Sequence, residues 1–456
     1  MTSARSADRK HAMVMGGSMA GLLAVRVLSD HYGKVTLVER DTLPSQPEQR
    51  RGVPQGRHTH GLLASGRDVL ERFFPGISRS LVDAGAVTGD IVRDSRWFFE
   101  GACLSRVPSG LNGLLMTRPM LEAAVRERVL AIANVVKVEN AAVEGLAVSD
   151  GSDRVIGLRI GGQTLPADLV VDATGRGSRT PQWLESMGYQ KPPEEAVQIG
   201  LSYTTRFFRR RLADLGGDMA VIIPPTPHGK RGGVMLAQEG DRWTVTLMAN
   251  FGPCAPEELK GFIEFARTLP APYVHEVVKK AEPLGEAATA RFPASIRRRY
   301  EALERFPAGY LVAGDAMCSF NPIYGQGMSV AALEAVELEK CLSAYNGDLA
   351  KTFFRRAAKV VDIPWSIAVG NDLRIPEAVG PRTPAVRFVN WYMSKLHKAA
   401  HSDPVPALAF HRVGNLLAPP PSVMHPRVAL RVLWRNVTTT KNSLEPEQLQ
   451  ATARAE

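Results

Sequence analysis

The fold is decided by residues 11–39, which read HAMVMGGSMAGLLAVRVLSDHYGKVTLVE. The apolar run at 11–15 leads into the glycine-rich turn GGSMAG, a helical stretch follows, and a second apolar run occupies 35–38. A strand, a glycine turn, a helix and another strand in this order form a βαβ unit. We therefore expect an α/β fold built around a parallel sheet.

The glycine turn and the acid that ends the second strand form a dinucleotide-binding pattern. Gly16 permits the tight turn, Gly21 lets the helix pack close to the strand, and Ser18 stands where a middle glycine is usual. The helix N-terminus offers unpaired N–H groups to a pyrophosphate. Glu39 would accept hydrogen bonds from an adenosine ribose. A tight turn alone does not explain the acid, so we predict a dinucleotide site.

A second glycine-rich segment, at 314–328, indicates which dinucleotide is bound. It reads GDAMCSFNPIYGQGM and follows a buried-strand pattern at 310–313. Asp315, at the strand end, would bond a ribityl hydroxyl. The backbone N–H groups of Gly327 and Met328, at a helix start, would stabilise negative charge on the N1–C2=O edge of a reduced flavin.

These motifs together resemble the FAD-dependent aromatic-hydroxylase-type monooxygenases, the single-component flavoprotein hydroxylases, over roughly residues 11–345. Three stretches look most like the epoxidases of bacterial polyether and terpenoid pathways: RRGVPQGRHTHGLL, VVDATGRGSRTPQWL and GDAMCSFNPIYGQGMSVAALEA. The resemblance implies a Rossmann-like FAD-binding domain interleaved with a mixed β-sheet substrate domain, plus a C-terminal helical region.

Domain boundaries follow from this arrangement. We expect the discontinuous FAD-binding domain to comprise residues 9–80, 111–180 and 284–348. The substrate domain would comprise 81–110 and 181–283. A C-terminal helical region is expected at 349–437 and a flexible tail at 438–456.

The resemblance also implies individual cofactor contacts. Arg51, with the backbone of Gly52 and Val53, would lie at the pyrophosphate and the flavin edge. Arg118 would reach the ribityl-phosphate region, and the Val143 backbone the adenine. The isoalloxazine would be lined by Pro322, Gly325, Gly327 and Met328.

Two histidines, His58 and His60, lie in the same loop as Arg51. A covalent histidyl link to flavin is one reading, but we expect ordinary hydrogen-bonding histidines and non-covalent FAD. Asp172, in the segment DATG, occupies the place of a family motif that helps bind both FAD and a nicotinamide cofactor. The family usually has an Asp-Gly pair in this motif, and Thr174 stands at the position of its aspartate. We expect Asp172 to brace its own turn.

The chemistry implied by the resemblance needs few reactive side chains from the protein. One oxygen atom from O2 would be inserted through a flavin C4a-hydroperoxide, and the protein must exclude water. We expect epoxidation of an alkene in an apolar polyketide or terpenoid intermediate, with no catalytic acid or base identified. The electron donor would be NADPH or NADH, either directly or through a reductase. Low-ranking substrate contacts are Tyr203, Asn250 and Phe251.

Other functions are weighed against epoxidation. An aromatic hydroxylase of the same family is the runner-up, followed by a flavin-dependent prenyl reductase and a non-redox cyclase. A flavin halogenase would need a lysine beside a tunnel and, in the tryptophan type, a W-x-W-x-x-P run that this sequence lacks.

The amino-acid composition restricts the class of protein, its metal content and its relation to membranes. The chain has 456 residues, 45% hydrophobic and 22% charged, which is typical of a globular protein. Its cysteines have no C-x-x-C or Cys–His ligand spacing, which argues against a structural zinc and fits a reducing cytoplasm, and we expect no metal site. No apolar run is long enough for a membrane span.

The net charge of +10 is concentrated near the C-terminus, since residues 351–456 hold 15 Lys and Arg against seven Asp and Glu. These basic residues alternate with apolar ones, a pattern that does not favour nucleic acid. We expect a cytoplasmic protein, with peripheral association at a membrane. Besides an apolar small molecule and O2, the expected partners are an acyl carrier protein or an anionic membrane surface, contacted through Arg427, Arg431 and Arg435.

Overall fold

The predicted βαβ unit is present as β1 (His11–Met15), α1 (Met19–Ser29) and β2 (Lys34–Val38). In the computed structural model, which describes residues 9–344 and 347–438, these strands belong to a five-stranded parallel sheet. Its order is β17-β11-β1-β2-β7, with β7 at Val135–Val138, β11 at Leu169–Asp172 and β17 at Tyr310–Val312. Three distant segments of the chain therefore build one sheet, as predicted. The tail predicted at 438–456 lies, beyond Thr438, outside the described residues.

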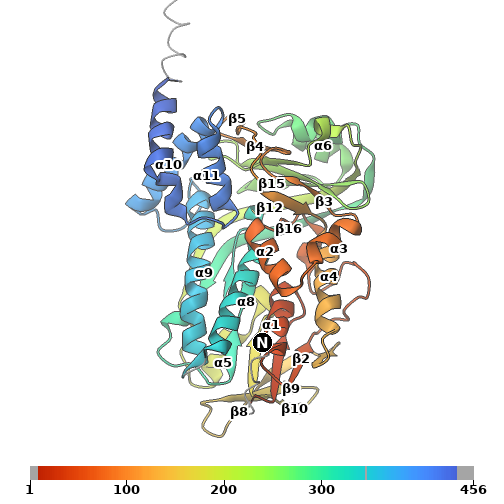
Figure 1. Cartoon of the computed structure of the whole chain (residues 1–456), viewed down its shortest axis with the longest axis vertical. Coiled ribbons are helices and arrows are strands. Elements are labelled where there is room, and N and C mark those ends of the chain that lie inside the picture. The colour runs from red at the N-terminus through yellow and green to blue at the C-terminus, as the bar shows by residue number, and fades with distance from the viewer. Residues whose placement is uncertain (1–8, 345–346, 439–456) are drawn as a thin grey trace, which may run out of the picture.

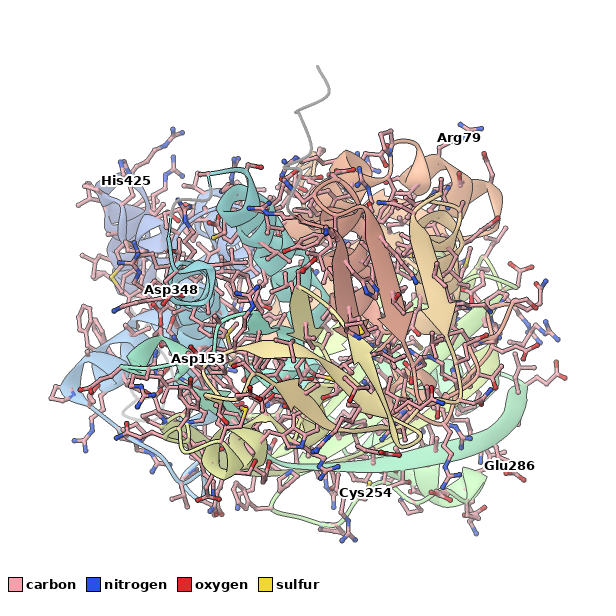
Figure 2. All side chains as sticks on the ribbon, turned by 90° about the horizontal axis from the view of Figure 1, so that it is seen from below. Arg79, Asp153, Cys254, Glu286, Asp348 and His425 are labelled. Atoms are coloured by element: carbon pink, nitrogen blue, oxygen red, sulfur yellow. The ribbon has the colours of Figure 1, made fainter. Side chains whose placement is uncertain are left out.

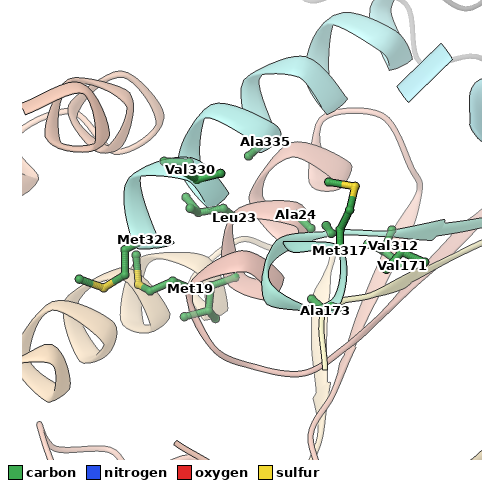
Figure 3. Packing of buried hydrophobic residues seen from close by; sticks show 14 of the residues in the cluster. Met19, Leu23, Ala24, Val171, Ala173, Val312, Met317, Met328, Val330 and Ala335 are labelled. Carbon is green, nitrogen blue, oxygen red and sulfur yellow. The ribbon is translucent and has the colours of Figure 1, made fainter. Parts of the chain in front are cut away.

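Helices α1 and α8 (Gly327–Ser343) pack together against this sheet (Figure 1). Leu23 of α1 and Val330 of α8 lie next to each other in the core, and Val171 of β11 lies beside Val312 of β17 (Figure 3). The helix α4 (Arg118–Leu130) begins after Thr117, whose hydroxyl caps it by accepting a hydrogen bond from the Met120 N–H at 3.3 Å.

An eight-stranded sheet lies above the parallel sheet in the view of Figure 1. Its order is β18-β16-β12-β15-β14-β13-β4-β5, and all neighbours are antiparallel except the β13–β4 pair. This is the predicted mixed substrate sheet. Its strands are β4 (Ser95–Phe99), β5 (Ala102–Cys103), β12 (Glu194–Arg209), β13 (Ala220–Ile223), β14 (Arg231–Gln238), β15 (Arg242–Asn250), β16 (Pro283–Arg298) and β18 (Cys318–Ser319).

One predicted boundary is wrong. Residues 284–298 were assigned to the FAD-binding domain, but β16 pairs antiparallel with β12 along most of its length and is therefore part of the substrate sheet. The chain returns to the parallel sheet only at β17. The apolar alternation of β16 predicts a strand but carries no information about which sheet it joins.

Smaller elements complete the two domains. Two antiparallel sheets are formed by β3 with β6 and by β8, β9 and β10. Helices α6 and α7 pack on the eight-stranded sheet, while α2 packs on α8 and α3 contacts α2 and α4. The bounds are β3 (Val87–Asp90), β6 (Asn112–Leu115), β8 (Val143–Val148), β9 (Val155–Ile160), β10 (Gln163–Pro166), α2 (Ala64–Phe73), α3 (Ile77–Asp83), α5 (Thr180–Ser186), α6 (Leu259–Arg267) and α7 (Tyr273–Val278).

The C-terminal region is helical, as predicted. It comprises α9 (Leu349–Asp372), α10 (Pro384–Ala400), α11 (Pro404–Gly414) and a helix over residues 426–438. Figure 1 shows α9 running beside α8 toward α10 and α11, which lie next to the substrate sheet. In the view from below, His425 of this region and Arg79 of α3 lie on opposite sides of the molecule (Figure 2). None of the described helices has the length and apolar character needed to cross a membrane.

Candidate functional site

A single cavity of about 2030 Å³ joins the two sheets and the C-terminal helices. Pockets for drug-sized ligands hold about 300–1,000 Å³, so this one has room for a dinucleotide and a second molecule. Its walls include the glycine turn after β1, the loop before α8, the inner face of the eight-stranded sheet, and parts of α9, α10 and α11.

The glycine turn has the geometry that its sequence predicts. Gly16 has φ of +98°, and a Cβ atom there would lie 2.6 Å from the Ala173 carbonyl oxygen. A Cβ atom on Gly21 would lie 1.7 Å from the Gly16 carbonyl oxygen. Side chains at either position would push α1 away from the sheet, so the steric roles predicted for both glycines are confirmed.

Glu39 ends β2 beside this turn and is only 6% exposed. Its carboxylate accepts hydrogen bonds from the Gly17 N–H at 2.8 Å and from the Arg50 guanidinium at 2.9 Å. The structure thus brings the predicted ribose acceptor to the cavity wall, next to the turn that would hold the pyrophosphate.

Arg50 was missed by the sequence analysis, which chose its neighbour Arg51. The Arg50 guanidinium is 7% exposed and also bonds Glu122 at 2.8 Å and the Gly17 carbonyl oxygen at 2.9 Å. Arg51 is exposed at the cavity rim. The pair RR predicts a basic group here, but not which of two consecutive side chains points inward.

Arg118, at the first position of α4, extends this charged cluster. Its guanidinium donates to the Ser18 hydroxyl at 2.7 Å, and Ser18 donates to Glu122 at 3.0 Å. The Arg118 Nε–H is buried without a hydrogen-bond partner among the described residues. Three arginines, Arg50, Arg118 and Arg126, form ion pairs with Glu39 and Glu122, and Asp41 lies 4.0 Å from the Arg50 guanidinium. An anion such as a pyrophosphate fits the unpaired Arg118 donor.

Asp315 follows β17 and lies near the glycine turn, since a Cβ atom on its neighbour Gly314 would be 2.6 Å from the Ala20 Cβ. Its carboxylate makes no hydrogen bond within the described residues and faces the cavity. Burial raises the pKa of Asp315, and the charges of Arg118 and Arg176 oppose that rise. An acceptor in this position suits a ribityl hydroxyl. The other predicted flavin contacts, Pro322, Gly325, Gly327 and Met328, line the same cavity, as do Gly52, Val53 and Val143.

A buried acid behind Asp315 was not anticipated. Glu334 of α8 is 2% exposed and accepts a hydrogen bond from the Gly314 N–H at 2.7 Å. Burial raises its pKa from 4.5 to about 7. The glutamate fixes the backbone from which Asp315 projects. The only sequence signal is an acid within an alanine-rich helix, and that pattern predicts a solvated face equally well.

Asp172 braces its own turn, as predicted. One carboxylate oxygen accepts from the Thr174 N–H at 2.8 Å and from its hydroxyl at 2.6 Å. The other oxygen accepts from the Ser178 and Thr180 hydroxyls at 2.6 and 2.5 Å. With every lone pair in use, Asp172 holds residues 172–180 in the shape that forms part of the cavity wall.

His58 and His60 have hydrogen-bond partners within the protein. His58 Nδ1 bonds the Thr205 hydroxyl at 2.9 Å, and its ring packs edge-on against Tyr203 at 4.7 Å. His60 bonds the His58 carbonyl oxygen at 3.0 Å and the Arg118 guanidinium at 3.3 Å. Burial lowers the pKa of His58 to about 4 and that of His60 to about 3, so both rings are neutral.

Of the three predicted substrate contacts, the structure brings one to the cavity. Tyr203 lines it. Asn250 is 1% exposed and donates to the Ile199 carbonyl oxygen at 2.9 Å, away from the cavity. Phe251 has φ of 51°, packs on Gly200 and is 39% exposed on the outside. Asn250 is the last residue of β15 and bonds the Ile199 backbone, and Phe251 lies beyond the strand, so neither residue lines the cavity.

Cavity-lining residues that sequence reasoning missed come from the C-terminal region. Helices α10 and α11 contribute Val386, Val389, Met393, His397, Phe410 and His411 to the cavity wall. The sequence predicts helices and a basic surface in this region, but no part in a site. The amphipathic pattern of α10 was a usable signal, because its apolar face needed a partner.

Taken together, the parallel sheet, the glycine turn and the polar cluster define a flavoprotein fold of the FAD-dependent monooxygenase and halogenase type. The solved structures that the chain resembles have this fold. A triple mutant of the flavin-dependent brominase Bmp2 matches with a TM-score of 0.65 and 14% identity over 95% of this chain and 99% of that one. PqsL, a probable FAD-dependent monooxygenase from Pseudomonas aeruginosa, matches with a TM-score of 0.59 and 15% identity over 80% and 97%. A flavoprotein/dehydrogenase from Cytophaga hutchinsonii matches with a TM-score of 0.65 and 15% identity over 95% and 100%.

The sequence comparison narrows this class to one family. The chain is 36% identical over 442 residues to Protein Rv3254 of Mycobacterium tuberculosis, and the match covers 91% of this chain and 92% of that protein. The chain belongs to the same family as Protein Rv3254. No protein-family model matches it.

Proposed function

We propose that this chain is an FAD-dependent monooxygenase that epoxidises an alkene in an apolar polyketide or terpenoid intermediate. The observation that carries the proposal is the continuity of one cavity from the dinucleotide cradle into an apolar chamber. The chamber walls come from the substrate sheet and the C-terminal helices and include Trp97, Phe99, Met219, Ile222, Leu236, Met248, Val389 and Met393.

The reaction balances with an external electron donor. One atom of O2 adds across the C=C bond of the substrate, the other leaves as water, and NADPH or NADH with one proton supplies the two electrons and two hydrogens. Bound FAD supplies the oxygen activation. No substrate proton is abstracted, which agrees with the neutral, hydrogen-bonded state of His58 and His60 beside the cavity.

The protein's own residues would hold the cofactor, face its reactive edge and keep water out of the site. Gly16, Ser18 and Arg118 would hold the pyrophosphate, and Asp315 the ribityl chain. The N–H groups of Gly327 and Met328 at the start of α8 would face the flavin edge on which negative charge develops. The apolar chamber would exclude water from the reacting carbon atoms, which protects activated oxygen from loss.

Two measurements test this function. The purified protein is expected to be yellow, and acid precipitation should release the colour because the FAD is non-covalent. Oxygen uptake with NADPH or NADH, with and without an added flavin reductase, is then measured against a panel of polyenes and phenols. A polyene product heavier by one oxygen atom supports epoxidation. Colourless protein that does not take up FAD would overturn the proposal.

One observation favours aromatic hydroxylation as a second candidate. Tyr324 lines the cavity beside Pro322 and donates to the carboxylate of Asp372 at 2.8 Å, while Asn371 donates to the Tyr324 hydroxyl at 2.8 Å. This series of hydrogen bonds offers a path along which a phenolic substrate can lose its proton. Tyr324→Phe should therefore abolish turnover of a phenol and leave epoxidation of a polyene intact, so the variant separates the two candidates.

The remaining alternatives give different products in the same assay. A prenyl reductase would reduce a polyene without oxygen uptake, and a cyclase would isomerise it without an electron donor. A halogenase would consume halide and is expected to carry a lysine beside its tunnel. None of the described residues that line the cavity is a lysine.

A further inference from the structure

Two buried histidines lie where α10 and α11 meet the substrate chamber. His397 is 3% exposed and His411 is 2% exposed, and both line the cavity. Neither ring nitrogen of His397 has a hydrogen-bond partner among the described residues, and the same holds for Nε2 of His411. A neutral imidazole carries one N–H donor and one lone-pair acceptor. Burying these groups unpaired is unfavourable, so their partner is expected to enter through the cavity.

Aromatic rings hold both imidazoles in place. His397 lies between Phe99 at 4.5 Å and Phe410 at 4.8 Å, measured between ring centroids. His411 packs edge-on against Trp97 at 5.0 Å. The Trp97 indole N–H already donates to the Ile91 carbonyl oxygen at 2.9 Å. The imidazole nitrogens are therefore the unpaired polar groups in an otherwise apolar pocket.

The charged groups around this pocket offer no free partner to an anionic ligand. Arg374 is paired with Glu100, and His401 bonds the Phe99 carbonyl oxygen at 2.9 Å. Burial, helped by Arg374, lowers the pKa of His397 to about 3, and burial lowers that of His411 to about 4. A carboxylate or phosphate would find no free countercharge here, whereas a neutral oxygen would find donors and acceptors.

We propose that His397 and His411 form a recognition subsite for a hydroxyl or carbonyl oxygen on the otherwise apolar substrate. This inference rests on the proposed function, because it concerns the same chamber. The ligand class is an apolar molecule that bears a neutral hydrogen-bonding group at the end seated between α10 and α11. Both histidines act by holding the substrate and take no part in oxygen transfer.

The test measures binding without turnover. FAD-loaded, oxidised protein is titrated calorimetrically with three probes that share one ring system: 1-naphthol, naphthalene and 1-naphthoate. We expect naphthol to bind about tenfold or more tightly than naphthalene, because a hydrogen bond to a buried group accounts for such a ratio. Naphthoate should bind more weakly than naphthol.

The variants His397→Phe and His411→Phe keep the aromatic packing and remove the nitrogens. Each should lower the naphthol-to-naphthalene affinity ratio toward one, and His397→Gln should restore part of it. The exposed His228, outside the cavity, provides the control His228→Asn. Equal binding of naphthol and naphthalene to the parent protein, no naphthol binding, or an unchanged ratio in both Phe variants would overturn the subsite. Loss of FAD binding or of oxygen uptake would instead count against the proposed function.

A second, independent observation concerns the outer face of the C-terminal region. Phe388 and Trp391 of α10 are 54% and 51% exposed. The neighbouring helix 426–438 exposes four more large apolar side chains, and the Asn436 amide donates to the Lys395 carbonyl oxygen at 2.9 Å between the two helices. We name the following set the C-terminal apolar face: Phe388, Trp391, Leu430, Leu433, Trp434 and Val437.

The cavity opens beside this face. Ala385 and Val389 of α10 are exposed and also line the cavity, so an apolar molecule can enter next to Phe388. Exposed Arg387 and Arg427 flank the apolar residues with positive charge. Arg431 and Arg435, which are also predicted to contact an anionic partner, both pair with the buried Asp403, at 3.0 and 3.4 Å.

We also propose that the C-terminal apolar face docks on an anionic lipid bilayer, from which the substrate enters the cavity. Tryptophan rings favour the membrane interface, and each basic residue near an anionic surface adds attraction that salt screens. The acidic charge of an acyl carrier protein would match Arg387 and Arg427 but would not account for the six exposed apolar side chains.

Co-sedimentation of the full chain tests this docking. Vesicles of phosphatidylcholine alone are compared with vesicles containing phosphatidylglycerol, at low and high salt. Binding only to the anionic vesicles at low salt, lost in Trp391→Ser/Trp434→Ser, is expected. Leu212→Ser is the matched control, since Leu212 is 77% exposed elsewhere. Absence of vesicle binding, dimerisation through the same tryptophans, or binding of acyl carrier protein alone would overturn it.

Discussion

A Cβ atom added to Gly21 would lie 1.7 Å from the carbonyl oxygen of Gly16. The first turn of α1 therefore packs against the end of β1 with no space for a side chain. This contact aims the helix N-terminus at the cavity, where the Gly17 and Ser18 backbone would meet a pyrophosphate. One backbone contact links the folding of the parallel sheet to cofactor binding.

Gly21→Ala should weaken FAD binding by at least about tenfold, or about 1.4 kcal/mol, because α1 must shift away from Gly16. Fluorescence titration of the FAD-free protein measures the affinity. Gly177→Ala is the control, since Gly177 lines the same cavity and a Cβ atom there would have nothing within 4 Å. Equal affinities of the two variants would contradict the steric role of Gly21.

Asp315→Ala should lower FAD affinity, because the Asp315 carboxylate is expected to bond the ribityl chain. A lost hydrogen bond in a buried site costs about 1–3 kcal/mol, or about 5–150-fold in affinity. Asp172→Ala should instead lower the free energy of unfolding by a similar amount, since it leaves the Thr174, Ser178 and Thr180 groups unpaired.

The comparison of these variants uses two separate readouts. Urea unfolding of FAD-free protein reports on the turn at Asp172, and FAD titration reports on Asp315. Asp315→Asn, which keeps an acceptor oxygen, should recover part of the affinity. If both alanine variants lose FAD to the same extent, then the DATG segment contacts the cofactor and Asp172 has more than a bracing role.

Arg50→Met should destabilise the protein by about 3–5 kcal/mol, because it leaves Glu39 and Glu122 buried without their main countercharge. Arg51→Met, at an exposed position one residue away, should change the free energy of unfolding little. Urea unfolding of both variants measures the difference. A destabilisation that is larger for Arg51→Met would contradict the assignment of the buried cluster to Arg50.

This pair of arginines also shows where sequence reasoning stops. Gly16, Gly21 and Glu39 could be predicted because backbone sterics and the end of a strand leave few alternatives at those positions. The sequence does not distinguish Arg50 from Arg51, because only the path of the loop turns one of the two side chains inward. The loop path depends on contacts with Glu122, a residue 72 positions away.

The C-terminal helices illustrate the same limit at a larger scale. Their helical character could be predicted from the local sequence pattern. The placement of His397 and His411 at the cavity, however, depends on ring contacts with Phe99 and Trp97 of β4. Such pairings join segments about 300 residues apart, and no local periodicity encodes them. The assignment of β16 to the wrong sheet has this origin too.

The buried Glu334 makes stability depend on pH. Its pKa rises from 4.5 to about 7 in the folded state because of burial, so between these values the folded protein holds a proton that the unfolded chain has released. The contribution of Glu334 to wild-type stability therefore falls as pH rises from about 4.5 to 7 and levels off above. Glu334→Gln stays neutral and keeps an acceptor for the Gly314 N–H. It should therefore gain stability relative to wild type across this window, by at most about 3 kcal/mol.

Urea unfolding at pH 5, 6, 7 and 8, with saturating FAD throughout, measures this difference. Glu337→Gln on the same helix is the control, because hydrogen bonds and the charges of Lys340 and Arg356 outweigh burial and hold the pKa of Glu337 below its ordinary value. The stability that Glu337 contributes is lost only below about pH 4.5, so its difference from wild type should stay constant from pH 5 to 8. A Glu334→Gln difference that is equally constant would mean that Glu334 is ionised throughout, and that Gly314 is held by a carboxylate rather than by a neutral acid.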